Sequence, residues 1–353
     1  MSLRAGRAES KSDIGGATFC TRHAIIKLFI VWLSPLLTPG QAKLVESIKK
    51  TAVLALFEKG CPFNRKIINI HNGEQRTPEY MKMNPQGLVP LLKDGEKIVV
   101  ESEKIIDYVD DQVKSGPTLV PDPSTSVGKE VKRLREFIDA IRIEIVTYGL
   151  LFNPELSISG IKIPKMLSNV KLINEKMQKN IASLEEAAQE YPDLRDSYIA
   201  KYQKTKKFYE DTVNKENVIE HLEDTDHRCE YLEECLRRSK ESSGGKEYWL
   251  TGTQFNAADI LLAVFMDRIV LLGLEDRYFC KTKRPLLYDY LQRIGQRKSV
   301  QMLRADVKTA FTMIMWNAAK AAVPYVVGIG LAIGAGVWLM KNKSRVINAF
   351  VEK

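Results

Sequence analysis

Glu101 and Ser102 are the neighbouring residues whose types and position most clearly suggest binding chemistry. They follow an apolar run that ends at Val100, and they open a predicted helix, ESEKIIDYVDDQV. At the N-terminus of a helix, unpaired backbone N–H groups and the helix dipole favour an anion. A serine hydroxyl can donate to the same anion, so Ser102 predicts a site for a small anionic group.

The cysteines form no recognisable metal or disulfide pattern. Their number is odd, their spacing is scattered and no CxxC pair occurs, which favours a reducing compartment. His227, Cys229 and Cys235 are close in sequence, but no second ligand pair follows at the spacing of a zinc site. We interpret them as residues of one charged helix and expect no metal. A redox sensor built on Cys229 and Cys235 is the alternative.

The composition is that of a folded protein with two modest domains or one large domain. The chain has 353 residues, of which 44% are hydrophobic and 27% charged, and its net charge is +9. Acidic and basic residues alternate along helical stretches, as they do on solvated helix faces. Because no zinc finger or recognition-helix pattern accompanies the positive charge, we do not expect nucleic acid as a partner.

The first third of the chain has the periodicity of a small α/β unit. The predicted order is a helix at 52–59, a strand at 63–70, a helix at 77–83, a hairpin that turns at Asp94–Gly95, and a helix that begins at Glu101. This order is most of a thioredoxin-like unit and lacks only the first strand. The apolar run at 24–37, AIIKLFIVWLSPLL, is a candidate for that strand. A secretory signal or an aberrant N-terminal extension is the alternative, and Lys27 interrupts the run.

The chain beyond the Pro- and Ser-rich linker at 115–126 is predicted to be helical. Charged amphipathic helices are expected at 127–150, 164–190, 195–213 and 215–240, and a strongly apolar helix at 257–272. Asn256 can cap the apolar helix, and Asp259 at its third position complements the N-terminal dipole. We expect this helix to cross the core of a second, all-α domain.

Three motifs resemble the glutathione transferase superfamily. The stretch 84–91, NPQGLVPL, resembles its NPxGxVPxL pattern, and Glu101–Ser102 resembles the acid–serine pair that starts the next helix. WLTG at 249–252 with NAAD at 256–259 resembles the start of the buried helix in its C-terminal domain. A charged helical insertion around 189–203, QEYPDLRDSYIAKYQ, together with a C-terminal apolar span, resembles the ganglioside-induced differentiation-associated protein 1 family.

The resemblance implies a glutathione transferase-like fold, α/β followed by all-α, with a C-terminal transmembrane helix. A divergent N-terminal extension at 1–45, which includes the candidate strand 24–33, comes first. A thioredoxin-like domain at 46–118 follows, and then a helical domain at 119–305 with the insertion at about 155–240. The chain would end with an interfacial amphipathic segment at 308–320 and a tail anchor at 321–340.

The resemblance also implies how glutathione would bind. Val89–Pro90 would form a cis peptide, and the Val89 backbone would pair with the cysteinyl backbone of the tripeptide. Ser102 would bind the γ-glutamyl carboxylate, and Glu101 would bind the ammonium group. The alternative is that the turn and the helix start only maintain a thioredoxin-like fold, as they do in non-catalytic relatives.

Catalysis would need a hydroxyl or thiol just after the first strand, where it would stabilise the glutathione thiolate. Ser34 is the hydroxyl nearest to the candidate strand, but the connection from there to residue 52 is unusually long. The catalytic residue is therefore undefined. Tyr148 is expected either to line a substrate cleft or to pack in the core.

A C-terminal apolar segment is expected to anchor the chain in a membrane. Residues 321–340 contain no charge, and Lys320, Lys341 and Lys343 flank them. A helix of that length spans about 30 Å, the thickness of a bilayer's hydrocarbon core. Insertion after synthesis would leave the rest of the chain in the cytosol, and the basic flanks and moderate hydrophobicity favour the mitochondrial outer membrane. The GxxxG pair Gly330 and Gly334 is compatible with a homodimer.

Two functions fit these expectations. The first is a membrane-tethered scaffold or regulator that acts in mitochondrial organisation and dynamics, with the charged insertion as the surface for protein partners. The second is an active glutathione transferase that acts on hydrophobic or oxidised substrates at the membrane. The unrecognisable motif after the first strand favours the scaffold, whereas a retained glutathione site would favour the enzyme.

Overall fold

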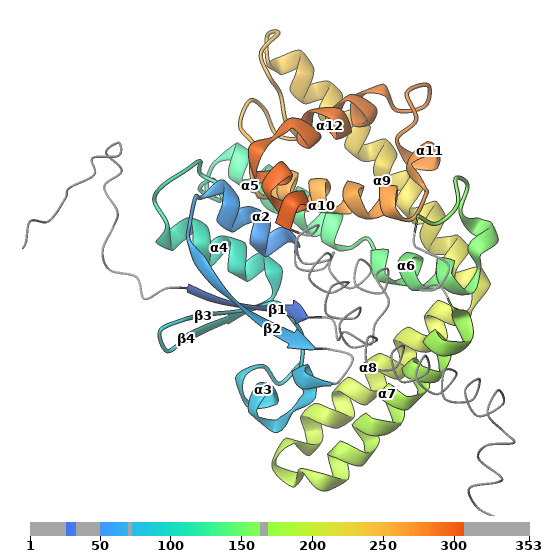
Figure 1. Ribbon diagram of the computed structural model, residues 1–353. Helices are drawn as coiled ribbons and strands as arrows, with labels where there is room; N and C mark the ends of the chain where they lie inside the picture. The colour runs from blue at the N-terminus through green and yellow to red at the C-terminus, as the bar shows by residue number, and fades with distance from the viewer. Residues whose placement is uncertain (1–25, 33–49, 70–72, 163–168, 307–353) are drawn as a thin grey trace, which may run out of the picture.

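The computed structural model describes residues 26–32, 50–69, 73–162 and 169–306 of the chain. Within these ranges, a four-stranded sheet with its helices forms the first domain, and the second domain is helical (Figure 1). The predicted α/β and all-α organisation is therefore confirmed. The predicted membrane segments at 308–320 and 321–340 lie outside the described residues, and none of the described helices is long and apolar enough to cross a membrane.

The sheet of the first domain has the strand order β2–β1–β3–β4. β1 (Ile26–Trp32) pairs in parallel with β2 (Phe63–Asn69) and antiparallel with β3 (Leu91–Asp94). β3 forms the predicted hairpin with β4 (Lys97–Val100). The structure thus places a strand in the apolar run at 24–37, at the position that the thioredoxin-like unit would otherwise lack.

Helices cover both faces of this sheet. α2 (Lys50–Glu58) and α4 (Ser102–Gln112) lie on one face, and α3 (Pro78–Met83) lies on the other (Figure 1). The run at 52–56 of α2, AVLAL, is buried along its whole length because α2 packs against α4 on one side and against the second domain on the other.

The second domain breaks one of the expected helices in two. Its helices are α5 (Ser126–Asp139), α6 (Ile143–Phe152), α7 (Val170–Glu190), α8 (Arg195–Val213), α9 (Lys215–Ser242), α10 (Ala257–Leu271), α11 (Glu275–Tyr278) and α12 (Pro285–Gln296). The prediction of one helix at 127–150 is wrong. α5 packs against α10, whereas the more apolar α6 packs between α8 and α9. A straight helix could not reach both positions, and the bend also buries Ile141.

α10 crosses the core, as its apolar sequence predicts. Asn256 accepts a hydrogen bond from the Ala258 amide at 3.0 Å, and Asp259 accepts one from the Asn256 amide at 3.0 Å. Asp259 also accepts from the Leu250 amide and the Tyr290 hydroxyl, both at 2.9 Å. Burial raises the pKa of Asp259 to about 6. This carboxyl therefore ties the start of α10, the preceding turn and α12 together.

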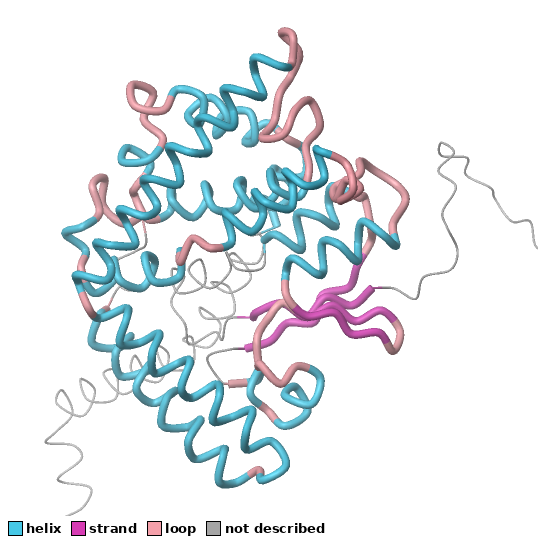
Figure 2. The backbone as a smooth tube through the Cα atoms, turned by 180° about the vertical axis from the view of Figure 1, so that it is seen from behind, coloured by secondary structure: helices cyan, strands magenta, loops and turns pink. Residues whose placement is uncertain are grey.

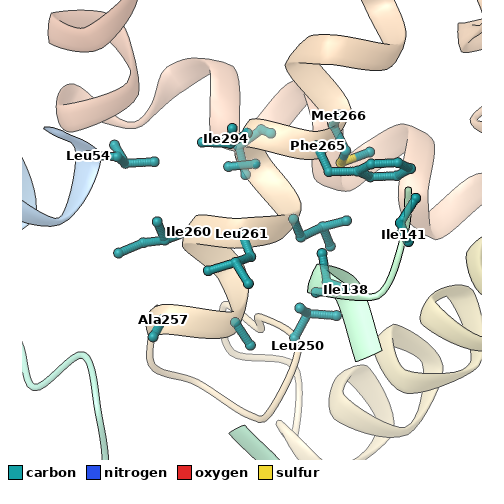
Figure 3. Close-up of a cluster of buried hydrophobic side chains, with 14 of the residues drawn as sticks. Leu54, Ile138, Ile141, Leu250, Ala257, Ile260, Leu261, Phe265, Met266 and Ile294 are labelled. Atoms are coloured by element: carbon teal, nitrogen blue, oxygen red, sulfur yellow. The ribbon is translucent and has the colours of Figure 1, made fainter. Parts of the chain in front are cut away.

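One continuous hydrophobic core joins the two domains. In Figure 3, Leu54 of α2 lies on one side of the cluster near Ile260 of α10, and Ile138 and Ile141 lie on the far side near Phe265. Burial of apolar surface contributes about 25 cal/mol per Å². The shared core therefore fixes how the two domains sit against each other.

A buried ion pair closes the first domain at the linker. The Lys59 ammonium group donates to Asp110 at 2.8 Å, and the side chains are only 3% and 9% exposed. The same carboxylate accepts from the backbone amides of Leu119 and Val120, both at 2.9 Å. Asp110 thus holds the beginning of the connection to the second domain against α4.

The substitution Asp110→Asn should lower the free energy of unfolding by about 3 kcal/mol, because it leaves Lys59 buried without its counter-charge. Asp111→Asn is the matched control, since Asp111 is 72% exposed and lies 3.6 Å from Lys114. We expect the control to change stability by less than about 0.5 kcal/mol. Urea unfolding of the full-length chain measures both, and equal stabilities of the two variants would contradict this role of the buried pair.

Candidate functional site

The turn before β3 contains the cis peptide bond Val89–Pro90. Pro90 is buried and Val89 is half-buried. Just before them, the carbonyl of Leu88 accepts hydrogen bonds from the Tyr80 hydroxyl and the Asn84 amide group, both at 2.8 Å. Side chains from α3 and from its C-terminal end therefore fix the backbone that leads into the turn.

The connection from β4 to α4 has an unusual backbone conformation. Glu101 has a φ of 71°, and it is the one non-glycine residue in the described ranges with a positive φ. Its carboxylate is paired with Lys104 at 3.1 Å. Ser102, the first residue of α4, follows directly and is half-buried. Such a conformation costs about 1–3 kcal/mol and persists only where the surroundings impose it, often at binding sites.

Two adjoining cavities lie between the domains beside these features. Val89 lines the larger cavity, of about 610 Å³. Ser102 lines the smaller one, of about 290 Å³. Ile143, Glu144 and Arg268 line both. The structure thus brings the predicted site residues Val89 and Ser102 to neighbouring parts of one interdomain region, although they belong to different elements.

Apolar side chains form much of the larger cavity's lining. They are Leu88, Val89, Ile143, Tyr148 and Phe208. The rings of Tyr148 and Phe208 pack edge to face with their centroids 5.5 Å apart. Tyr148 therefore both lines a cleft and packs, which combines the two alternatives that the sequence left open. Burial raises the pKa of Tyr148, so its hydroxyl remains protonated at neutral pH.

Basic residues also line the larger cavity. They are Arg142, Lys201, Lys204, Lys207 and Arg268, and the acidic residues there are Glu144 and Asp211. Arg142 pairs with Glu144 at 2.5 Å and Lys207 with Asp211 at 3.4 Å. The lining holds more basic than acidic side chains, and this positive balance suits a ligand with carboxylate groups.

Sequence reasoning did not identify Arg268 and Lys201. Arg268 is only 4% exposed, and its guanidinium donates to the Thr147 hydroxyl at 3.3 Å. A basic residue inside the apolar sequence of α10 was a signal that could have singled it out. Lys201, in contrast, is one of many lysines on a charged helix, and only the folded chain distinguishes it.

The candidate cysteines and histidine lie outside the lining of this site. Ser34 lies outside the described residues. Cys229 and Cys235 are buried in α9 and His227 is exposed, so they do not share one face. Burial raises the pKa of both thiols. Within the described ranges, no group of three His, Cys, Asp or Glu side chains could hold a metal ion.

The described residues have a glutathione transferase-like fold. Residues 50–112 match the family described as glutathione S-transferase, N-terminal domain. The structure is similar to the beta-etherase LigF from Sphingobium sp. strain SYK-6, with a TM-score of 0.52, 22% identity and coverage of 80% of this chain and 100% of that one. It is also similar to Ure2p in complex with glutathione, with a TM-score of 0.50, 15% identity and coverage of 79% and 97%.

The chain is also similar along most of its length to ganglioside-induced differentiation-associated protein 1-like 1. Identity to the Homo sapiens protein is 26% over 309 residues, which covers 82% of this chain and 83% of that protein. The Mus musculus protein is 25% identical over 309 residues. The resemblance predicted from the sequence is therefore confirmed.

Proposed function

We propose that this chain is a glutathione-binding, transferase-like protein of the mitochondrial outer membrane that acts in mitochondrial organisation and dynamics as a scaffold or regulator. The observation that carries the glutathione part is the pairing of β1 with both β2 and β3. It completes the thioredoxin-like sheet from which the Val89–Pro90 turn and the start of α4 extend. A detached N-terminal segment would have left that site incomplete.

Glutathione would bind across the two cavities. The amide and carbonyl of Val89 pair with the cysteinyl backbone, and the amide and hydroxyl of Ser102 bind the γ-glutamyl carboxylate at the N-terminus of α4. Glu101 accepts from the γ-glutamyl ammonium group. The positive balance of the larger cavity supports the same ligand, and the solved structure of Ure2p, which shares the fold, is a complex with glutathione.

Ser102→Ala should weaken the binding of glutathione to the full-length chain by about tenfold or more, because a hydrogen bond to a charged group is lost. Ser126→Ala is the matched control, since Ser126 is also the first residue of a helix, α5, and is exposed. Calorimetric titration with glutathione measures both variants. Equal affinities for the two variants would show that Ser102 does not contact the ligand.

The membrane part of the proposal rests on the sequence and on the similarity to the ganglioside-induced differentiation-associated proteins. Residues 321–340 would cross the outer membrane, 308–320 would lie on its surface, and the two domains would face the cytosol. Protein partners would bind the outward face of α7 and α8, which is rich in charged residues. A homodimer formed through the anchor is compatible with this arrangement.

Removal of residues 321–353 should release the protein from mitochondria into the cytosol, because no other uncharged stretch of the sequence is long enough to hold it there. Removal of residues 346–353 alone is the control, since it keeps both the apolar stretch and its basic flank. Cell fractionation locates each variant. Retention of the longer truncation on mitochondria would mean that 308–320 or a partner is the real anchor.

The second candidate function is an active glutathione transferase on hydrophobic or oxidised substrates. The apolar lining of the larger cavity, directly beside Val89, favours it. Under the scaffold proposal, full-length protein should not accelerate the reaction of glutathione with a chlorodinitrobenzene or an alkyl hydroperoxide above the uncatalysed rate. A saturable increase in rate that Ser102→Ala reduces and Ser126→Ala leaves unchanged would favour the enzyme.

A further inference from the structure

The two inserted helices α7 and α8 pack against the first domain. They form an antiparallel pair that lies beside α3 in both views (Figures 1 and 2). In this subsection, the hairpin means this α7–α8 pair and not the β3–β4 hairpin. Met81 of α3 is fully buried against Leu184 and Ala188 of α7 and Tyr198 of α8. Its neighbour Tyr80 packs on the opposite side, within the sheet domain. α3 is therefore held between its own sheet and the hairpin.

Polar contacts fix the same interface. The guanidinium of Arg76 donates to the Asn180 carbonyl at 3.1 Å and to the Ser183 hydroxyl at 2.9 Å. In return, the Tyr198 hydroxyl donates to the Arg76 carbonyl at 2.5 Å. Contacts made in both directions by partly buried groups leave the hairpin little freedom to slide along α3.

Lys201 extends this interface to the turn of the candidate site. Its ammonium group donates to the carbonyl of Gln86 at 2.7 Å and to that of Gly87 at 3.0 Å. Gly87 has a φ of 54°, and a Cβ there would lie 3.1 Å from Lys201 Cε and 2.9 Å from Met81 Sδ. A side chain at position 87 would not fit, because its Cβ would also lie 2.9 Å from the Gln75 carbonyl oxygen, and Lys201 contacts the same backbone from the hairpin.

These bonds restrain the carbonyl groups of residues 86–88 from two sides. Lys201 holds those of Gln86 and Gly87 from the hairpin, and Tyr80 and Asn84 hold that of Leu88 from within the first domain. The next residue is Val89. A backbone held in its binding conformation before the ligand arrives loses less entropy on binding.

We propose that Lys201 is a positioning residue for glutathione: it fixes the backbone at 86–88 so that Val89 presents its amide and carbonyl to the cysteinyl part of the tripeptide. This inference rests on the proposed glutathione binding. It also gives the hairpin a role inside the site, in addition to its outward surface for partners.

The charge of Lys201 provides a second way to observe this role. Burial, and then the nearby Arg76 and Lys204, lower the pKa of Lys201 to about 8. The other charged groups around the cavity are Arg142, Glu144, Lys207, Asp211 and Arg268. Loss of the Lys201 proton between pH 7 and 9 removes one positive charge from beside the carbonyls of Gln86 and Gly87. A neutral amine donates weaker hydrogen bonds to the two carbonyls than an ammonium group does.

The test compares Lys201→Met, Lys201→Arg and Lys206→Met in the full-length chain, with S-methylglutathione as the probe because it has no titrating thiol. We expect Lys201→Met to weaken binding about tenfold and Lys201→Arg to restore most of the affinity. Lys206→Met removes an equal charge from an exposed position of α8 outside the cavity lining and should change affinity less than twofold. Amide hydrogen exchange at 86–89 should accelerate in Lys201→Met and not in Lys206→Met.

The pH dependence of binding gives a second test. The affinity of the wild type for S-methylglutathione should fall more steeply between pH 7 and pH 9 than that of Lys201→Arg. The amino group of the ligand titrates with both proteins, whereas only the wild type also loses the charge at position 201. If the wild type does not bind the probe at all, the proposed function fails and this inference with it. If the wild type binds and Lys201→Met binds equally well with unchanged exchange at 86–89, only this inference is overturned.

Discussion

The pairing of β1 with its two neighbours is the interaction on which the rest of the structure depends. β1 pairs with β2 along 26–32 and with β3 over 27–29, so it is the strand that joins the two halves of the sheet. Without β1, the β3–β4 hairpin would stand apart from β2, and an isolated two-stranded hairpin is marginally stable. The Val89–Pro90 turn leads into β3 and Ser102 follows β4. Both halves of the candidate site are therefore positioned by the fully buried Leu28 and its neighbours in β1.

The second constraint is the packing of α10 against the first domain. Ile260 and Leu261 share one core with α2, and Arg297 beyond α12 pairs with Glu58 at the end of α2 at 2.6 Å. Because the cavities lie between the domains, this packing sets their width. Arg268 extends from α10 into both cavities, so a core helix also supplies a charged group to the site.

The sequence predicted what depends on local chemistry and missed what depends on distant contacts. The turn before β3, the hairpin at Asp94–Gly95 and the cap at Asn256 all follow from short motifs, and each has the expected form. The sequence offered the first strand at 24–33 only as one of several alternatives, since its partners are 37 and more residues away and only pairing with them decides among the alternatives. The sequence did not reveal the break between α5 and α6, because the helical pattern of apolar residues continues from one helix into the next. The bend is required only by the packing of α6 between α8 and α9.

The site shows the same division. Val89, Glu101 and Ser102 belong to recognisable motifs, whereas Lys201 differs from nearby lysines only in what it contacts. Arg268 carried a weak signal, because a cation in an apolar helix needs a reason to be there. Lys201 and Arg268 join the described site only through the packing of α8 and α10 against the first domain.

The contact of Lys201 with Gln86 also has a consequence for synthesis of the chain. The two residues are separated by 115 positions. At about 5–20 residues per second, a ribosome adds Lys201 roughly 6–23 s after Gln86. During that interval the thioredoxin-like domain can emerge and fold, but α7 and α8, which contact its loop at 86–88, have not yet been made. The loop of the first domain therefore gains its last contacts only after the second domain has been made. The two domains are separate in sequence, but the first does not reach its final structure without the second.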